Sequence, residues 1–370
     1  MRALLIVLDI PEIDSWKGDP DFALPALDAL GFWKALSADV FHPRSQGVHG
    51  CWGQIRHQAR GHDATSEFWE MAGVVLDEPL PTFTRFPDDF VRAIEKDAGV
   101  EFIGNRAASG VAILEEFGAE HLRTRKPILY TSRDSVLQIA AHEEAIPLPK
   151  LYEICRVARR HSDKRRIGRV IARPFRGQPG RFERTANRCD HAMPPPRTVL
   201  NALAEAGLHV EGVGEVATLF AGSGITRNHP IEAAEDALKI IDELWKRDED
   251  GLIFAQLRSS DWIEHLDPSV ARAETLRSFD QWLRHFEPRV EQDDLLLITM
   301  TDLTGSRDES EKSMNPLFML RGDRTGPLGT RRTAADVAAT LAEYFELRRP
   351  WPAGESFLRA RATRSFRGAI

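Results

Sequence analysis

The chain has 370 residues, enough for one large domain or two ordinary domains with buried cores. Its 49 Lys and Arg residues against 56 Asp and Glu residues give a net charge of −7, which argues against a general nucleic-acid-binding role. The three cysteines are far apart and form no CxxC pair, which argues against a zinc ribbon or a disulfide framework. No segment is typical of a signal peptide or a membrane span, so we expect a cytoplasmic protein with no membrane partner.

The first predicted element is a buried strand. Residues 3–8 form a continuous apolar run that ends in Asp9, a pattern typical of a central parallel strand with a functional residue at its carboxyl end. Similar runs recur at 252–257 and 295–299. Apolar residues at helical spacing predict three late helices, the last with Thr333 as its N-cap: 231–246, 270–286 and 332–345. Alternating strands and helices indicate an α/β core with a parallel-dominated sheet.

Prolines divide the middle of the chain from its ends. Pro79, Pro81 and Pro87 precede a self-contained segment, about 90–195, that is rich in Arg and Gly, and a second proline cluster, 194–196, follows it. A basic run at 159–166 precedes a predicted strand. We interpret that run as a solvated loop, with an anion-steering patch as the alternative.

The segment 128–144 contains a possible anion-binding turn. An apolar strand, 128–130, leads into a polar turn with Ser132 and Asp134, and a helix is expected to begin near Ser135. Backbone N–H groups gathered at a helix N-terminus suit anionic ligands. The alternative is an ordinary capped helix with Asp134 or Ser135 as the N-cap, and the residues alone favour it.

This segment closely resembles the sequence YTSADSVxQIAAHEE of the bacterial phosphopentomutases, which interconvert ribose 1-phosphate and ribose 5-phosphate. Further matches follow in the same order: 104–106 with 108–110, Glu120-His121 with Thr124, 151–155, 168–175 and 184–188. The resemblance implies an alkaline-phosphatase-like α/β core made of residues 1–89 and 196–370. It also implies an inserted α/β cap, 90–195, that holds the sugar phosphate.

The resemblance implies two divalent metal ions, typically manganese, and a phosphorylated Ser or Thr nucleophile. Asp9 matches the first metal-binding aspartate of the family, although it could instead cap the next turn, and the glycine-dependent loop after it is altered. The family motif GKDTxTGHWExxG corresponds to residues 61–73. In that frame Ala64 occupies the position of the catalytic threonine, and Thr65 is the adjacent candidate nucleophile.

The remaining metal motifs are less well preserved. Asp261 matches a metal-binding aspartate, and His265 matches a metal-binding histidine if one residue is deleted. A metal-free Asp–His pair at a helix start explains these two residues equally well. In the last two motifs Asp302 is the remaining candidate ligand, and the final histidine is missing.

The sugar-phosphate motifs are better preserved. Ser132 and Asp134 match positions that contact the ribose, and Arg173 and Arg188 match arginines at the phosphate end, where guanidinium groups suit phosphate oxygens. Glu215 replaces a family lysine, a change of two charges that we expect to oppose a phosphate in its usual pose. Arg133, which replaces an alanine, could restore one positive charge.

Three hypotheses follow from this pattern. The first is a protein that binds a pentose phosphate or a related phosphosugar and has lost or altered the mutase chemistry. The second is an enzyme with altered chemistry on a phosphosugar, using one metal ion or the Asp261–His265 pair as acid and base. The third is a phosphopentomutase with Thr65 as a displaced nucleophile.

Overall fold

The computed structural model describes residues 1–10, 23–36, 47–59, 63–132, 134–231, 234–258, 268–301, 314–348 and 351–359. The chain forms two compact units. Unit 1 contains residues 1–77, 195–217 and 222–370, and unit 2 contains residues 78–194 and 218–221. The first break therefore comes before Glu78, whereas the sequence placed it at 89–90, a position inside helix α4 (Asp88–Ala98).

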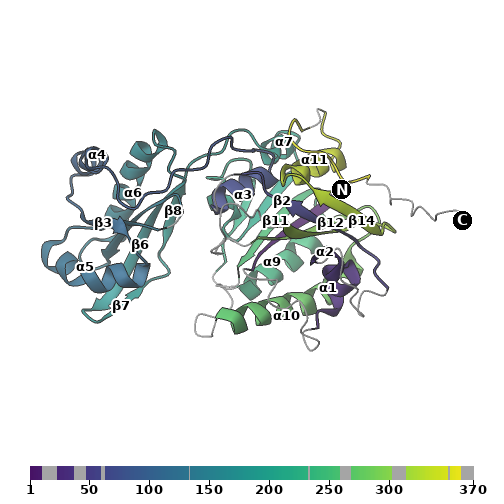
Figure 1. Ribbon diagram of the computed structural model, residues 1–370, viewed down its shortest axis with the longest axis horizontal. Coiled ribbons are helices and arrows are strands. Elements are labelled where there is room, and N and C mark those ends of the chain that lie inside the picture. The colour runs from purple at the N-terminus through teal and green to yellow at the C-terminus, as the bar shows by residue number, and fades with distance from the viewer. Residues whose placement is uncertain are drawn as a thin grey trace, which may run out of the picture. The chain divides into compact units, whose positions relative to one another are not determined.

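Unit 1 is built on an eight-stranded sheet in the order β10-β9-β11-β1-β12-β13-β2-β14 (Figure 1). Only β13 runs antiparallel to its neighbours, so the sheet is parallel-dominated, as the sequence predicted. Its strands are β1 (Arg2–Asp9), β2 (Cys51–Arg56), β9 (His209–Val213), β10 (Arg227–His229), β11 (Gly251–Arg258), β12 (Leu295–Thr301), β13 (Met314–Leu320) and β14 (Gly326–Arg331).

Helices cover both faces of this sheet (Figure 1). One face packs against α1 (Pro25–Leu30), α2 (Phe32–Leu36), α9 (Ala234–Lys246) and α10 (Pro268–Phe286) through a buried apolar cluster. The other is covered by α3 (Ala64–Met71), α7 (Val199–Glu205) and α11 (Ala335–Tyr344), and the Phe68 ring of α3 stacks on Phe254 at 5.5 Å. Because both faces are covered, β1 is apolar at every position from Ala3 to Leu8.

The three late helices lie where the sequence predicted them, although their ends differ slightly. The N-cap of α11 is Ala334 and not the predicted Thr333, but the Thr333 hydroxyl accepts a hydrogen bond from the Ala335 N–H at 3.2 Å. Two short elements remain. Helix α8 (Val216–Leu219) follows β9, and the last residues of α8 belong to unit 2. A 3-10 turn (Glu287–Arg289) follows α10. No described helix has the length and apolar character needed to cross a membrane.

Unit 2 has its own six-stranded mixed sheet in the order β3-β4-β5-β6-β7, with β8 paired to β6. Its strands are β3 (Ile103–Ala107), β4 (Ile128–Thr131), β5 (Val136–His142), β6 (Arg169–Gln178), β7 (Arg181–Arg184) and β8 (Cys189–Ala192). Its helices are α4, α5 (Gly110–Thr124) and α6 (Leu148–Asp163). The fold class predicted from the sequence, an α/β core plus a second α/β segment, is therefore confirmed.

The helix expected near Ser135 was a wrong prediction. Residues 136–142 form strand β5, which pairs antiparallel with β4 and parallel with β6. Every residue of β5 is buried, so its apolar run has no alternation that would distinguish a strand from a buried helix. Ser132 and Asp134 therefore lie in a hairpin turn, closed by a 2.7 Å hydrogen bond from the Thr131 hydroxyl to the Val136 carbonyl.

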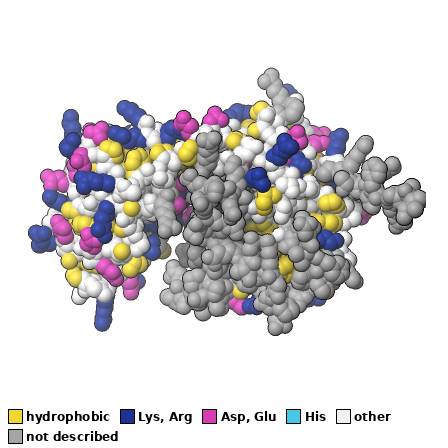
Figure 2. All heavy atoms as spheres, in the orientation of Figure 1, with side chains coloured by type: hydrophobic (Ala, Val, Ile, Leu, Met, Phe, Trp, Pro, Cys, Tyr) yellow, Lys and Arg dark blue, Asp and Glu magenta, His cyan; other side chains and the backbone are white. Residues whose placement is uncertain are grey.

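The basic run at 159–166 is also not a solvated loop. It covers the last turns of α6 and the turn that follows, and Arg159, Arg165 and Arg166 each pair with a carboxylate within unit 2. Arg159 contacts Asp163 at 2.9 Å, and Arg165 and Arg166 contact Asp89 and Glu78. On the face seen in Figure 2, basic and acidic side chains are likewise interspersed over this unit.

Candidate metal centre and sugar-phosphate site

Helix α3 begins at the segment where the sequence placed the nucleophile. Asp63 is its N-cap, and its Oδ1 accepts the Thr65 N–H at 2.8 Å. Ala64 is the first helical residue and carries only a methyl group. The Thr65 side chain is fully buried, and its hydroxyl has no hydrogen-bond partner among the described residues.

Asp9 lies at the carboxyl end of β1, between two parallel neighbours. Its register partners are Arg258 at the end of β11 and Thr301 at the end of β12, and its side chain is 6% exposed. Ligands in open α/β sheets bind beyond this edge. The other predicted metal ligands, Asp261, His265 and Asp302, lie outside the described residues, as does Arg133.

A buried acidic group lies at this edge, and we call it the carboxyl-edge group: Asp9, Asp63, Glu67, Glu70 and one imidazole, His57. Burial raises the pKa of Glu67 to about 7, and repulsion from Asp9, Glu70 and Asp63 adds to that effect, while attraction to His57 opposes it. Burial disfavours a charged His57, but Glu67 and Glu70 outweigh it and raise the His57 pKa. His57 thus offsets part of the negative charge of Glu67 and Glu70.

Glu70 has a structural role within this group. Its carboxylate accepts hydrogen bonds from the Ala59 N–H at 2.7 Å, the Thr333 hydroxyl at 2.6 Å and the Ala334 N–H at 2.9 Å. Burial opposes its ionisation, but nearby His57 and these donors hold its pKa at about 2. Glu70 thus ties α3 to the loop after β2 and to the start of α11, and its oxygens are already occupied.

The other oxygens are suited to a hard divalent cation. Within the described ranges, the Thr65 hydroxyl, the Thr301 hydroxyl and the Glu67 Oε2 are buried without a hydrogen-bond partner. Unpaired buried polar atoms are costly, and a bound cation would satisfy them. Carboxylate and hydroxyl oxygens are the ligands that magnesium and manganese prefer, so this donor set fits the cation that the resemblance implies.

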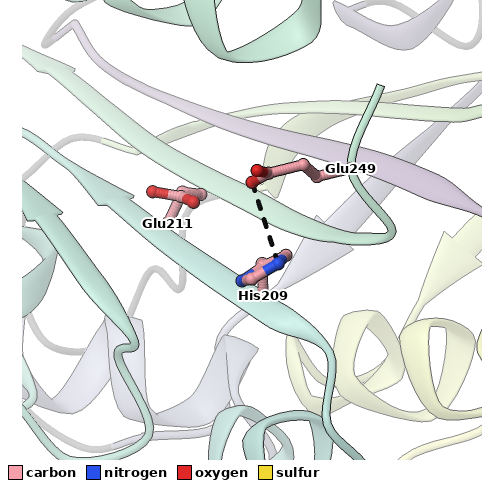
Figure 3. A group of neighbouring side chains, drawn as sticks. All are labelled: His209, Glu211 and Glu249. Atoms are coloured by element: carbon pink, nitrogen blue, oxygen red, sulfur yellow. Dashed lines mark ion pairs between the residues drawn. The ribbon is translucent and has the colours of Figure 1, made fainter. Parts of the chain in front are cut away.

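A second acidic group lies at the opposite, amino end of the same sheet, and we call it the amino-edge group: His209, Glu211 and Glu249 (Figure 3). Their ligand atoms lie within 4.8 Å of one another, a spacing that a metal ion could bridge. However, the Arg227 guanidinium contacts Glu211 at 2.8 Å and Glu249 at 2.5 Å. His229 also contacts Glu211, at 2.6 Å, so a protein cation already occupies the place that a metal ion would take.

Unit 2 gathers arginines around a buried tyrosine. Arg173 on β6 is mostly buried, and its pKa falls to about 10, first because of burial and then because of repulsion from Arg188 and Arg184. Burial raises the pKa of Tyr130, and these three arginines act on it in the opposite direction. Arg188 also makes two 2.6 Å hydrogen bonds to Asp190. Three like charges held close together favour an anionic ligand.

The predicted ribose contacts lie in the same unit. Asp134 faces Arg169 at 3.8 Å, and Arg169 lies 3.9 Å from Asp190, so this aspartate belongs to the same charge network as Arg188. Ser132 lines an open pocket with Ser109, Thr82 and Thr84. The structure thus places all four predicted sugar-phosphate residues in unit 2, and it adds Tyr130, Arg169 and Arg184, which the sequence did not single out.

The expected conflict at Glu215 takes a different form in the structure. The Glu215 carboxylate contacts the Arg258 guanidinium at 2.8 Å, within unit 1. The negative charge that replaces the family lysine is therefore neutralised locally, and the argument that it would oppose a phosphate loses its basis.

The comparisons with known proteins place the chain in a family. Three proteins named phosphopentomutase illustrate the similarity. The one from Carboxydothermus hydrogenoformans is 40% identical and covers 88% of this chain and 86% of its own. The one from Anaeromyxobacter dehalogenans is 41% identical, with 91% and 88% covered, and the one from Caldanaerobacter subterraneus is 38% identical, with 97% of each covered.

Other comparisons add less. No family model matches the chain. Among solved structures, a phosphoglycerate mutase from Leishmania mexicana covers 96% of this chain and 97% of its own, with 9% identity and a TM-score of 0.45. The PH0037 protein of Pyrococcus horikoshii covers 93% and 97%, with 15% identity and a TM-score of 0.42. The sequence relatives are sufficient by themselves: the chain belongs to the phosphopentomutase family.

Proposed function

We propose that this protein binds a pentose phosphate, or a closely related phosphosugar, and that it does not perform the phosphoryl relay of the phosphopentomutases that it resembles. Ala64 is the observation that supports this proposal most directly. It is the first residue of α3, in the motif position of the phosphorylated threonine, and a methyl group cannot accept a phosphoryl group.

The cap residues support retained binding. Arg173, Arg184 and Arg188 act together on Tyr130, and Arg188 is held in place by Asp190. Guanidinium groups fixed in this way can form paired hydrogen bonds to phosphate oxygens. A divalent cation, when bound at the carboxyl edge of unit 1, would neutralise the buried carboxylates there. Manganese as that cation, and a cytoplasmic location, stay predictions.

A second candidate function is an active mutase with Thr65 as its nucleophile. One observation favours it: the Thr65 hydroxyl is buried without a partner beside the Asp63 cap. This candidate requires a phosphoryl group on Thr65 during turnover. The two candidates therefore differ in a single measurable species.

Binding and turnover of the purified full chain separate the two functions. We expect calorimetry to detect ribose 5-phosphate but not ribose, and Arg173→Ala to weaken binding more than tenfold because a buried phosphate-facing charge is lost. Arg176→Ala is the matched control, since Arg176 is exposed on the same strand and pairs with Glu183. Two results together would establish the second candidate instead. The unmodified chain would convert ribose 1-phosphate while Thr65→Ala would not, and mass spectrometry would find a phosphothreonine.

A further inference from the structure

Glu67 is the one acid of the carboxyl-edge group that the family motif does not explain. In the frame of residues 61–73, the motif has a glycine at position 67 and a threonine at position 64. This chain has a glutamate and an alanine at those positions. It has therefore lost one oxygen at position 64 and gained a carboxylate three residues later.

Helix α3 brings these two positions together. Residues three apart on a helix lie on the same face, about 5–6 Å between Cβ atoms. The helix starts at Ala64, its first turn is fixed by the Asp63 cap, and the Glu67 N–H donates to the Asp63 carbonyl at 3.1 Å. A carboxylate at position 67 can therefore reach toward the place that a hydroxyl at position 64 would occupy.

Among the described residues, the charge of Glu67 is only partly neutralised by a neighbouring cation. The side chain is 6% exposed, and its Oε2 has no hydrogen-bond partner in the described part of the chain. Asp9 and Asp63 lie close enough to repel it, and His57 is shared with Glu70, 3.7 Å away. The independent observation is the Thr65 hydroxyl, two residues away, which is completely buried and also has no hydrogen-bond partner among the described residues.

We propose that Glu67 is a ligand of a divalent cation at the carboxyl edge, together with Asp9, and that it takes the place of the oxygen missing at Ala64. This inference rests on the proposed function, because Glu67 would supply a cation-binding oxygen in place of the one at position 64 without restoring the threonine hydroxyl of the family motif. Oxygen ligands of this kind suit a hard cation such as manganese.

Manganese binding by the full chain tests the proposal without any turnover. We expect Mn²⁺ to bind without any other ligand. Calorimetry and the loss of the free-ion electron paramagnetic resonance signal both measure this binding. Glu67→Gln, which keeps the shape but removes the charge, should weaken Mn²⁺ binding at least tenfold, and Asp9→Asn should do the same. Glu249→Gln is the matched control in the amino-edge group and should bind Mn²⁺ as the unmodified chain does.

Three results would overturn the proposal: no Mn²⁺ binding by the unmodified chain, unchanged binding by Glu67→Gln, or loss of binding in Glu249→Gln alone. If Glu67→Gln does not fold, Glu67→Asp tests the ligand role in its place. Its carboxylate is one methylene shorter and should bind Mn²⁺ more weakly, and an affinity equal to that of the unmodified chain would exclude a ligand role. Failure of the proposed function has a different signature, namely absence of ribose 5-phosphate binding or conversion of ribose 1-phosphate.

Discussion

The two ends of the large sheet hold acidic groups of similar composition in opposite electrostatic states. At the amino edge, Glu211 and Glu249 share the guanidinium of Arg227, and His229 adds a further contact to Glu211. At the carboxyl edge, Asp9 and Asp63 repel Glu67, and the described cation that acts on Glu67 is the His57 imidazole, which also serves Glu70. The two edges are about 23 Å apart along β1, so each is electrostatically a separate site.

The difference shows why close carboxylates alone do not identify a metal site. The amino-edge group satisfies a distance criterion for metal binding, yet its charge is already neutralised by an arginine. At the carboxyl edge, Glu67 Oε2 and the Thr65 hydroxyl are buried without a hydrogen-bond partner among the described residues, which is the condition that a cation relieves. This edge is also where ligands bind in sheets of this kind.

Removing His57 should have the largest effect, because it takes away the counter-charge of the carboxyl edge. We expect His57→Gln to lower the free energy of unfolding by about 3–5 kcal/mol at neutral pH without metal, the usual cost of breaking a buried ion pair. The loss should be smaller at acidic pH, where Glu67 takes up a proton. Chemical denaturation at both pH values measures this difference.

A double-mutant cycle supplies the control for this prediction. His57→Gln combined with Glu67→Gln removes both charges, so the double variant should be more stable than the sum of the two single effects predicts. Strictly additive effects would instead mean that His57 and Glu67 do not interact. Additive effects would also contradict the claim that the two edges of the sheet differ in electrostatic state.

Glu67→Gln should by itself stabilise the metal-free protein. The ordinary carboxyl pKa of 4.5 rises to about 7 in the folded state, so the folded protein binds this proton more tightly than the unfolded chain. The stability contributed by this group is therefore complete below pH 4.5 and is lost as the pH rises to about 7. Above that range the variant should gain on the order of 3 kcal/mol.

The measurement is the free energy of unfolding across this pH window, with and without Mn²⁺. The unmodified chain should lose stability with rising pH only when metal is absent, because a bound cation favours the ionised carboxylate. Glu67→Gln should show neither this slope nor the metal effect. A slope that persists in the variant would assign the titration to another group.

The sequence predicted most of the frame and only part of the site. Continuous apolar runs located β1, β11 and β12, and the motif placed Ala64, the first residue of α3, at the nucleophile position. It did not find His57 as the partner of Glu67, because the two residues lie in different segments of the chain and their proximity has no local signature. A signal for Glu67 existed, since this charged residue occupies a glycine position of the motif.

Two other features were inaccessible for physical reasons. Strand β5 is buried on both faces, so its periodicity did not exclude a helix. The contact between Glu215 and Arg258 joins the ends of adjacent parallel strands, and such a long-range pair has no local signature. The charge change at position 215 was therefore interpreted without its partner.

The last and smallest prediction is that removal of Arg227 allows the amino-edge group to bind a cation. Arg227→Gln removes the guanidinium between Glu211 and Glu249 and leaves His209 and both carboxylates within 4.8 Å of one another. We expect a modest loss of thermal stability and a new, weak Mn²⁺ site that calorimetry resolves as a second binding event. Glu249→Gln added to this variant should abolish the new site and leave the carboxyl-edge site unchanged. If Arg227→Gln gains no cation binding, then the arginine is not what separates the two edges, and the geometry of the donors must account for the difference.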